Sequence, residues 1–230
     1  MLSTNEGQLN LEGSKVYESF SETVHAIDQL HDWKNEDIEI ISKKSQDIQK
    51  KFLSLPPPIQ LRLHSDLLSY YQCCVKCLSE EKSLLDAASH IWFFFNLLKL
   101  RPPSDLFSTL ESGDLVEVYD NTGLQVFRSF KLLSFTSYSL EDILVYRWDE
   151  LFERDESITQ QLISQAQTVL SSGDFSTQWN CVPDIHLVKE INSEEKRCFA
   201  LRFKRIAPLK SDSPYFSHFL SSFEAKKIEI

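Results

Sequence analysis

Two cysteines three residues apart, Cys74 and Cys77, are the first side chains whose type and spacing could do chemistry. A C-x-x-C pair exchanges electrons when it follows a strand at the start of a helix, and it binds zinc when a second Cys or His pair lies at matching spacing. Here the pair comes late in a helical pattern, after 67–71, and no second pair is near. We predict small buried helical residues and no metal site, with redox or metal chemistry as the alternative.

An acidic run at 149–156 is the second candidate, because paired carboxylates can move protons when burial raises one pKa. Its members are close together along the chain, so their side chains are expected to point around a helix end into water. They are Asp149, Glu150, Glu153, Asp155 and Glu156. The sequence has no P-loop, G-x-G-x-x-G or G-x-S-x-G motif, and its histidines stand without a nucleophile beside them, as at His25, His31 and His64. We expect no catalytic function.

The charge balance argues against nucleic acid as a direct partner. The 230 residues carry 24 Lys and Arg against 34 Asp and Glu, which gives a net charge of −10 and a pI near 5.1. Nonspecific affinity for nucleic acid comes mainly from basic side chains. The one basic cluster, at 196–205, is expected to be the solvent face of a strand, with an acidic partner surface as the alternative.

Cysteine usage and hydropathy predict a cytoplasmic protein. The five cysteines are odd in number and unevenly spaced, unlike a secreted disulfide framework. No run reaches the roughly 18 apolar residues that a membrane span needs. The first residues also show no basic and apolar signal pattern. We therefore expect no membrane span and no secretory signal.

The elements that carry these residues divide the chain near residue 101. No glycine occurs between 14 and 112, and prolines at 56–58 and 102–103 mark helix ends. Apolar residues recur at helical spacing through this stretch. We predict a flexible N-terminus at 1–13 and a helical segment at 14–101. Its helices are expected to start near residues 14, 35, 58 and 79 and to end near residues 30, 55, 75 and 100.

Four successive aromatic residues, Trp92, Phe93, Phe94 and Phe95, lie in the last of these helices. Successive helical side chains point about 100° apart, so one packed side cannot hide all four rings. A helix that is apolar all round must be covered by something. We predict that 91–100 mediates self-association into a homo-oligomer, with Phe94 or Phe95 as the outward member. A buried central helix is the alternative.

From Gly113 onward, the sequence pattern changes from helical to mainly strand-like. An Asn-Thr-Gly turn between two alternating stretches predicts a hairpin, and three further strands show period-2 patterning. Capped helical patterns lie between them. The predicted elements are a hairpin at 114–129, short helices at 139–144, 148–154 and 157–170, three antiparallel strands within 175–206, and a C-terminal tail at 209–230 with a short helix at 215–223.

This order of elements resembles the PAS sensor domain over residues 112–208. Asp120-Asn-Thr-Gly123 looks like the acidic-x-x-Gly turn that joins its first two strands. Ser139-Leu-Glu-Asp-Ile-Leu144, with Trp148-Asp-Glu-Leu-Phe152 and Asp155, resembles its Gly-Tyr-Ser-x-Glu-Glu-Leu and Leu-Phe-His-Pro-Asp-Asp stretch. The resemblance implies an α+β fold in which a five-stranded antiparallel sheet, with helices on one face, follows the helical segment. It also implies sensing, dimerisation or regulated protein contact.

The resemblance implies a ligand pocket lined by residues of the last strands, namely Phe175, Trp179, Phe199, Leu201 and Phe203. Simple core packing by these side chains is the alternative. Haem-binding members carry a histidine on or near the long helix, and photoactive flavin-binding members carry a cysteine motif before it. Residues 157–172 contain no histidine, and the cysteines of this half lie on strands. Alternation places His186 outward, so we expect no cofactor.

These features predict a non-catalytic cytoplasmic signalling or regulatory module, placed in transcriptional or two-component regulation, whose output lies in another signalling or regulatory protein. A small-molecule ligand is compatible with this role. The alternative is an acidic protein-binding scaffold of the secretion-chaperone kind. A pocket between the 175–206 strands and the 139–170 helices would favour sensing, whereas a filled core with an exposed apolar helix would favour the scaffold.

Overall fold

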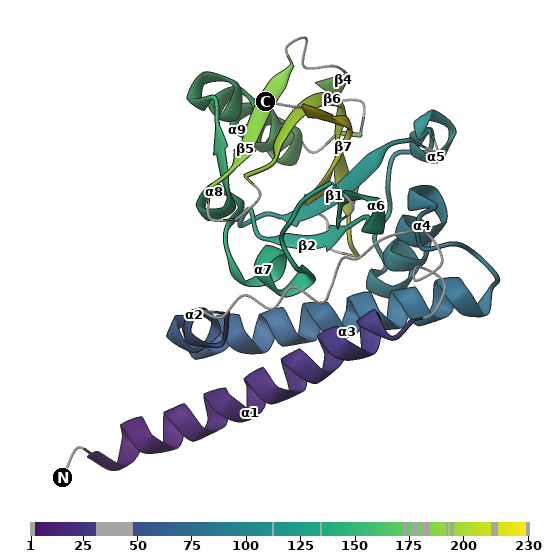
Figure 1. Cartoon of the computed structure of the whole chain (residues 1–230). Coiled ribbons are helices and arrows are strands. Elements are labelled where there is room, and N and C mark those ends of the chain that lie inside the picture. Colours follow the sequence, from purple (N-terminus) through teal and green to yellow (C-terminus); the bar gives the residue numbers. More distant parts are fainter. Residues whose placement is uncertain are drawn as a thin grey trace.

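The computed structural model describes residues 3–30, 48–111, 113–133, 135–172, 174–175, 179–180, 185–191, 193, 196–212 and 216–228. They form the predicted α+β fold, with helices first and a curled antiparallel sheet after them (Figure 1). The helices of the first half are α1 (Ser3–Asp28), α2 (Ile48–Ser54), α3 (Pro57–Ser79), α4 (Ala87–Leu98) and α5 (Leu106–Thr109). The second half contains β1 (Leu115–Asp120), β2 (Gln125–Arg128), α6 (Phe130–Leu133), α7 (Leu140–Val145), α8 (Trp148–Leu151), β3 (Phe152–Arg154), α9 (Glu156–Ser172), β4 (Trp179–Asn180), β5 (His186–Glu190), β6 (Cys198–Lys210) and β7 (Phe216–Ile228).

Local sequence signals set the helix ends of the first half. Prolines occupy the first turn of α3, where a missing N–H costs no intrahelical bond. The Asp86 carboxylate caps α4 by accepting from the Ala88 N–H at 3.2 Å, and Lys99 ends it in the left-handed region at φ 54°. The helix predicted to start near residue 79 therefore starts at Ala87, and Ser79 is the last residue of α3. α1 already begins at Ser3, within the stretch expected to be flexible. Most of the helix predicted at 35–55 lies outside the described residues, which show α2 from Ile48.

The sheet has seven strands rather than the five expected. Six follow one another in the order β2-β1-β7-β6-β5-β3, and β4 pairs with β6. The predicted hairpin is present as β1 and β2. Its turn is held by Asp120, whose Oδ1 accepts from the Thr122 and Leu124 N–H groups at 2.9 Å each, while Gly123 takes φ 80°. The extra strands are β3, in a stretch predicted to be helical, and β7.

The C-terminal segment was predicted wrongly. Residues 216–228 form β7, a strand between β1 and β6 in the sheet, and not a tail with a short helix. β7 pairs with β6 along almost its whole length and with β1 over six residue pairs. Such pairing partners lie far away in the sequence, so the periodicity of apolar residues alone cannot reveal them. The sheet therefore extends to residue 228, twenty residues past the expected boundary at 208.

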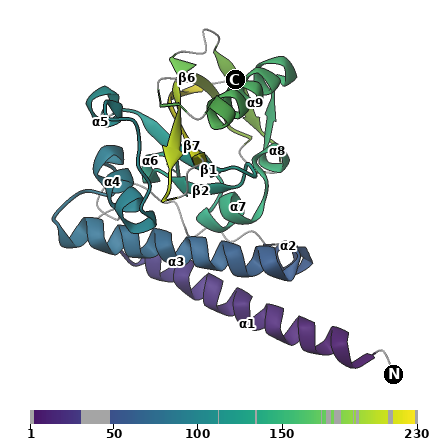
Figure 2. The ribbon, with the colours of Figure 1, turned by 180° about the vertical axis from the view of Figure 1, so that it is seen from behind.

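Alternation on β1 sends side chains to two different layers. Val116 and Val118 belong to the core shared with the N-terminal helices, which also contains Phe94 and Phe127. Leu115 belongs to a second cluster, with Phe203 and Phe223, on the opposite face of the sheet. The N-terminal helices thus lie on one side of the sheet and α9 on the other (Figures 1 and 2). The first and second halves of the chain share one hydrophobic core.

Candidate functional site

A groove of about 790 Å³ lies between α9 and the sheet face opposite to the N-terminal helices. This volume falls within the range of small-molecule sites. Leu55, which follows α2, lies at one end with Ile59 and Leu63 of α3, and the 120–125 turn, α7 and α8 form further walls. α9 and strands β6 and β7 supply its apolar wall, with Leu162, Ile163, Ala166, Leu170, Ile206 and Phe219. The groove therefore touches both halves of the chain.

A smaller cavity of about 40 Å³ adjoins the groove, and the two share Glu117, Arg154 and Phe203. Phe199, Leu201 and Phe203, three of the residues expected to line a pocket, line this smaller cavity from β6. Phe175 is half-buried in a turn, and the side chain of Trp179 lies outside the described part of the chain. The cavity is large enough for about one water molecule or a small ligand group.

Polar side chains gather where the groove meets the cavity. Arg128 on β2 forms an ion pair with Glu117 on β1 at 3.0 Å, and both are buried. The Tyr119 hydroxyl donates to the other oxygen of Glu117 at 2.7 Å. Burial, together with the nearby Glu117 charge, raises the pKa of Tyr119, so its hydroxyl stays protonated at neutral pH.

Arg154, at the end of β3, completes this cluster. Its guanidinium stacks over the Trp148 ring, with 3.3 Å between the guanidinium carbon and the ring centroid. The Arg154 Nε is buried and has no hydrogen-bond partner in the described structure. Burial lowers the Arg154 pKa to about 10, which leaves the group charged at neutral pH.

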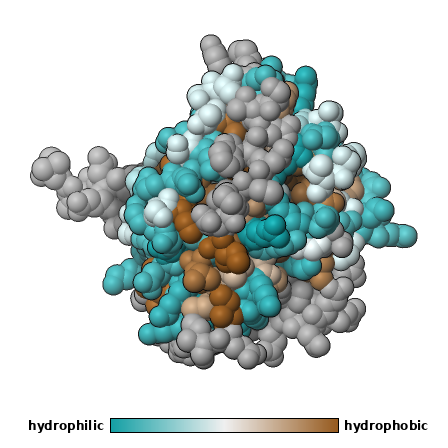
Figure 3. Space-filling view, turned by 90° about the horizontal axis from the view of Figure 1, so that it is seen from above, coloured by the Kyte–Doolittle hydropathy of each residue, from teal (hydrophilic) through white to brown (hydrophobic). Residues whose placement is uncertain are grey.

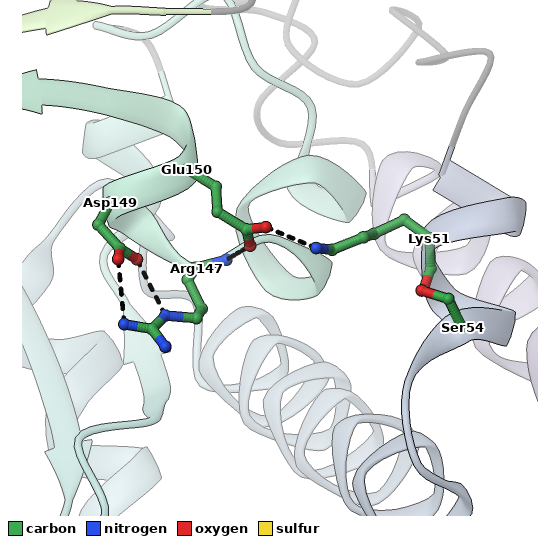
Figure 4. Close-up of polar contacts among 5 residues, drawn as sticks. All are labelled: Lys51, Ser54, Arg147, Asp149 and Glu150. Carbon is green, nitrogen blue, oxygen red and sulfur yellow. Dashed lines mark hydrogen bonds and ion pairs between the residues drawn. The ribbon is translucent and has the colours of Figure 1, made fainter.

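Contacts around α8 position Arg154, because β3 follows α8 without a connecting loop. The Glu150 carboxylate accepts from the Arg147 N–H at 3.0 Å and from Lys51 Nζ of α2 at 2.6 Å, while Arg147 pairs with Asp149 (Figure 4). The strand register places Arg154 opposite Val188 of β5. Members of the predicted acidic run thus form structural ion pairs here, and its other residues are exposed.

His186 lies inside the molecule, against the prediction that it points outward. It is fully buried, whereas its neighbours Ile185 and Leu187 are 60% and 59% exposed. The alternation was assigned correctly, but its two faces were exchanged, because the face with Val188 and Glu190 packs inward. Burial lowers the His186 pKa to about 4, and neither ring nitrogen has a hydrogen-bond partner in the described structure.

One group of carboxylates has the spacing of a metal site, formed by Glu111, Asp114 and Glu224. The ammonium of Lys204 already lies among them, 2.8 Å from Glu111, 2.7 Å from Asp114 and 2.8 Å from Glu224. This ammonium neutralises the cluster where a cation would bind. The group is therefore explained as an ion-pair network, which carries no metal site.

The C-x-x-C cysteines are buried helical residues, as predicted. Cys73, Cys74 and Cys77 all lie on α3 and are almost fully buried. Burial raises the pKa of Cys77 to about 11, and those of Cys73 and Cys74 further. Since the thiolate is the reactive form, these thiols are poor nucleophiles at neutral pH.

The four successive aromatic residues of α4 do not share one environment. Phe93, Phe94 and Phe95 are at most 9% exposed, whereas Trp92 is 49% exposed. Phe94 packs against Phe127 of β2, with 4.7 Å between ring centroids. The sheet therefore covers part of α4, and the outward member is Trp92 rather than Phe94 or Phe95.

The groove residues were partly accessible to sequence reasoning. Glu117 and Arg128 lie opposite each other in the predicted hairpin, so a cross-strand ion pair could have been expected. Arg154 has no comparable signal, because it follows an acidic run and its strand partner is thirty-four residues away.

Comparison of the chain with protein-family models, with curated proteins and with solved structures gave no match. Among the described helices, none has the length and apolar character to cross a membrane.

Proposed function

We propose that this chain is a non-catalytic, cytoplasmic regulatory module that binds a small molecule in the groove under α9. The observation that carries the proposal is a groove of ligand size between the sheet and the helices. The chain order of a hairpin, short helices and three strands, here β4 to β6, is the order on which the PAS-like resemblance rests, and β3 and β7 are additional to it. We expect the output to lie in another signalling or regulatory protein, in transcriptional or two-component control.

Contacts at the groove suggest how occupancy would be transmitted. Arg62 of α3 pairs with Asp120 at the end of β1, and Lys51 of α2 pairs with Glu150 of α8. Both pairs join a groove wall to an N-terminal helix. A ligand that binds one packing of these helices better than another shifts the population toward it. The helices would then present a changed surface to the partner.

Filling the groove is expected to abolish ligand uptake. Ala166 lines the groove on α9 and is 7% exposed, so Ala166→Phe places a ring in it. With the neutral dye Nile red as probe, we expect saturable fluorescence enhancement for the wild type and at least tenfold weaker binding for the variant. Ser164→Phe, on the exposed side of α9, is the matched control and should bind like the wild type.

Circular dichroism checks that both variants fold, and Ile163→Trp at the groove replaces Ala166→Phe if the latter does not. Absence of saturable binding by the wild type, or equal binding by the groove variant and its control, would contradict the proposed function.

The second candidate is the protein-binding scaffold. Leu61, Leu68 and Val75 recur every seven residues on α3 and are 57%, 38% and 41% exposed. A repeat of seven places them on one stripe of the helix, as in a helix–helix interface. This apolar stripe favours contact with another protein, independently of the groove.

Self-association through α4 stays a prediction, now centred on Trp92. If this exposed ring is buried between two copies, Trp92→Glu should shift the protein from dimer to monomer, because it would place a charge in an apolar contact. Multi-angle light scattering at rising concentration measures this. Phe107→Tyr, a mild change elsewhere in the helical half, serves as the control. A wild-type protein that stays monomeric at high concentration contradicts the prediction.

A further inference from the structure

The cluster of Glu117, Arg128 and Arg154, where the groove meets the cavity, carries one positive charge in excess. Among the described residues that line the cavity, Arg128 and Arg154 are cationic and Glu117 is the one carboxylate. Asp149 of the groove also acts on Arg154, but it is paired with Arg147. Glu117 already pairs with Arg128 and accepts from Tyr119. Arg154 makes no ion pair with a carboxylate in the described structure, and what it does contact is the face of Trp148.

Arg154 is half-buried, and an excess charge partly removed from water is costly unless a partner compensates it. Stacking on Trp148 fixes the plane of the guanidinium and leaves its edge, with the N–H donors, free to face the groove and cavity that Arg154 lines. A planar guanidinium held in this way matches the two oxygens of a carboxylate. Part of the groove wall is apolar, with Leu162, Ile206 and Phe219 along it.

We propose that the groove binds a carboxylic acid with an apolar body, whose carboxylate pairs with Arg154. This inference rests on the proposed function and names the chemical class of its ligand. One negative charge balances the cluster, whereas a phosphate monoester carries nearly two. The apolar body would lie between α9 and strands β6 and β7, against Leu162, Ala166, Ile206 and Phe219.

The test compares ligands that differ in the head group alone: decanoate, decanol, decylamine and decyl phosphate. Binding to the full chain is measured by isothermal titration calorimetry at pH 7.5. We expect decanoate to bind roughly ten- to a hundredfold more tightly than decanol, which is the range for a charge-assisted hydrogen-bonded pair. Decylamine should bind most weakly, and decyl phosphate no better than decanoate.

Arg154→Met keeps the apolar stem and removes the charge, so the decanoate-to-decanol ratio should fall to about one. Arg202→Met makes the same chemical change on an exposed position of β6 away from the groove, and it should leave the ratio unchanged. Melting curves of both variants without ligand check that they remain folded. Arg154→Gln gives a second, polar variant if Arg154→Met does not fold.

Each outcome is decisive. Equal binding of decanoate and decanol by the wild type, or an unchanged ratio in Arg154→Met, overturns the carboxylate assignment while the groove still binds apolar molecules. Tighter binding of decyl phosphate than of decanoate also overturns it and points to a phosphate ligand. If neither Nile red nor any decyl compound binds, the proposed function fails as well.

Discussion

Replacing Phe127 with alanine is expected to lower the free energy of unfolding by about 3–5 kcal/mol. Phe127 lies on β2 and is 2% exposed. Its ring packs against side chains of the N-terminal helices, with centroid distances of 5.7 Å to Tyr70, 4.9 Å to His90 and 4.7 Å to Phe94. Removing the Phe127 ring therefore removes contacts that join the sheet to α3 and α4, and leaves a cavity between them.

Because this core is shared, the helical half and the sheet should unfold together. Urea unfolding followed by far-UV circular dichroism and by tryptophan fluorescence should give coincident transitions for wild type and variant, both displaced to lower urea in the variant. Leu187→Ala, at a position of β5 that is 59% exposed, is the apolar control and should cost less than about 1 kcal/mol. Two separate transitions, with the helical half unaffected by Phe127→Ala, would contradict a shared core.

The second large effect concerns acid stability and His90. His90 is fully buried on α4 among the rings of Tyr70, Phe127 and Phe130. Burial lowers its pKa to about 3, from a usual value near 6.5. The nearest titratable groups are Tyr70, Cys73 and Cys74 on α3, and burial raises their pKa values, so they stay neutral between pH 5 and 8.

The direction of this pH effect on stability follows from proton binding by His90 in the folded and unfolded states. Below about pH 6.5 the unfolded chain protonates this histidine, whereas the folded protein does not until about pH 3. Its contribution to stability is therefore fully present above pH 6.5 and is lost as the pH falls. At pH 5 the loss from this one group amounts to about 2 kcal/mol relative to pH 8.

His90→Phe should remove this loss while keeping a ring in the aromatic cluster. We expect the variant to gain about 2 kcal/mol on the wild type between pH 8 and pH 5, measured as the difference in unfolding free energy by urea titration. His90→Gln, which does not titrate, separates packing from protonation: it should be less stable at both pH values but show the same reduced pH dependence. Parallel curves for wild type and both variants would refute the effect.

Local signals in the sequence determined much of the helical half and the hairpin. Prolines mark the start of α3, and the Asp-Asn-Thr-Gly turn determines the β1–β2 hairpin. These features depend on residues within a few positions of each other, so they can be predicted from the sequence alone. The same holds for the buried cysteines of α3, which follow from the helical pattern around them.

Only the tertiary structure decided which faces are buried and where the groove lies. The alternating pattern of β5 allows either of its faces to be buried, and the pattern of 216–228 allows either a helix or a strand. Pairing with distant strands selects one possibility in each case. His186 therefore turns inward and β7 enters the sheet. Arg154 becomes part of the groove because β3 pairs with β5 and α9 covers the sheet. Its excess charge exists only in that arrangement, since it depends on which carboxylates the fold brings near, and composition cannot show this.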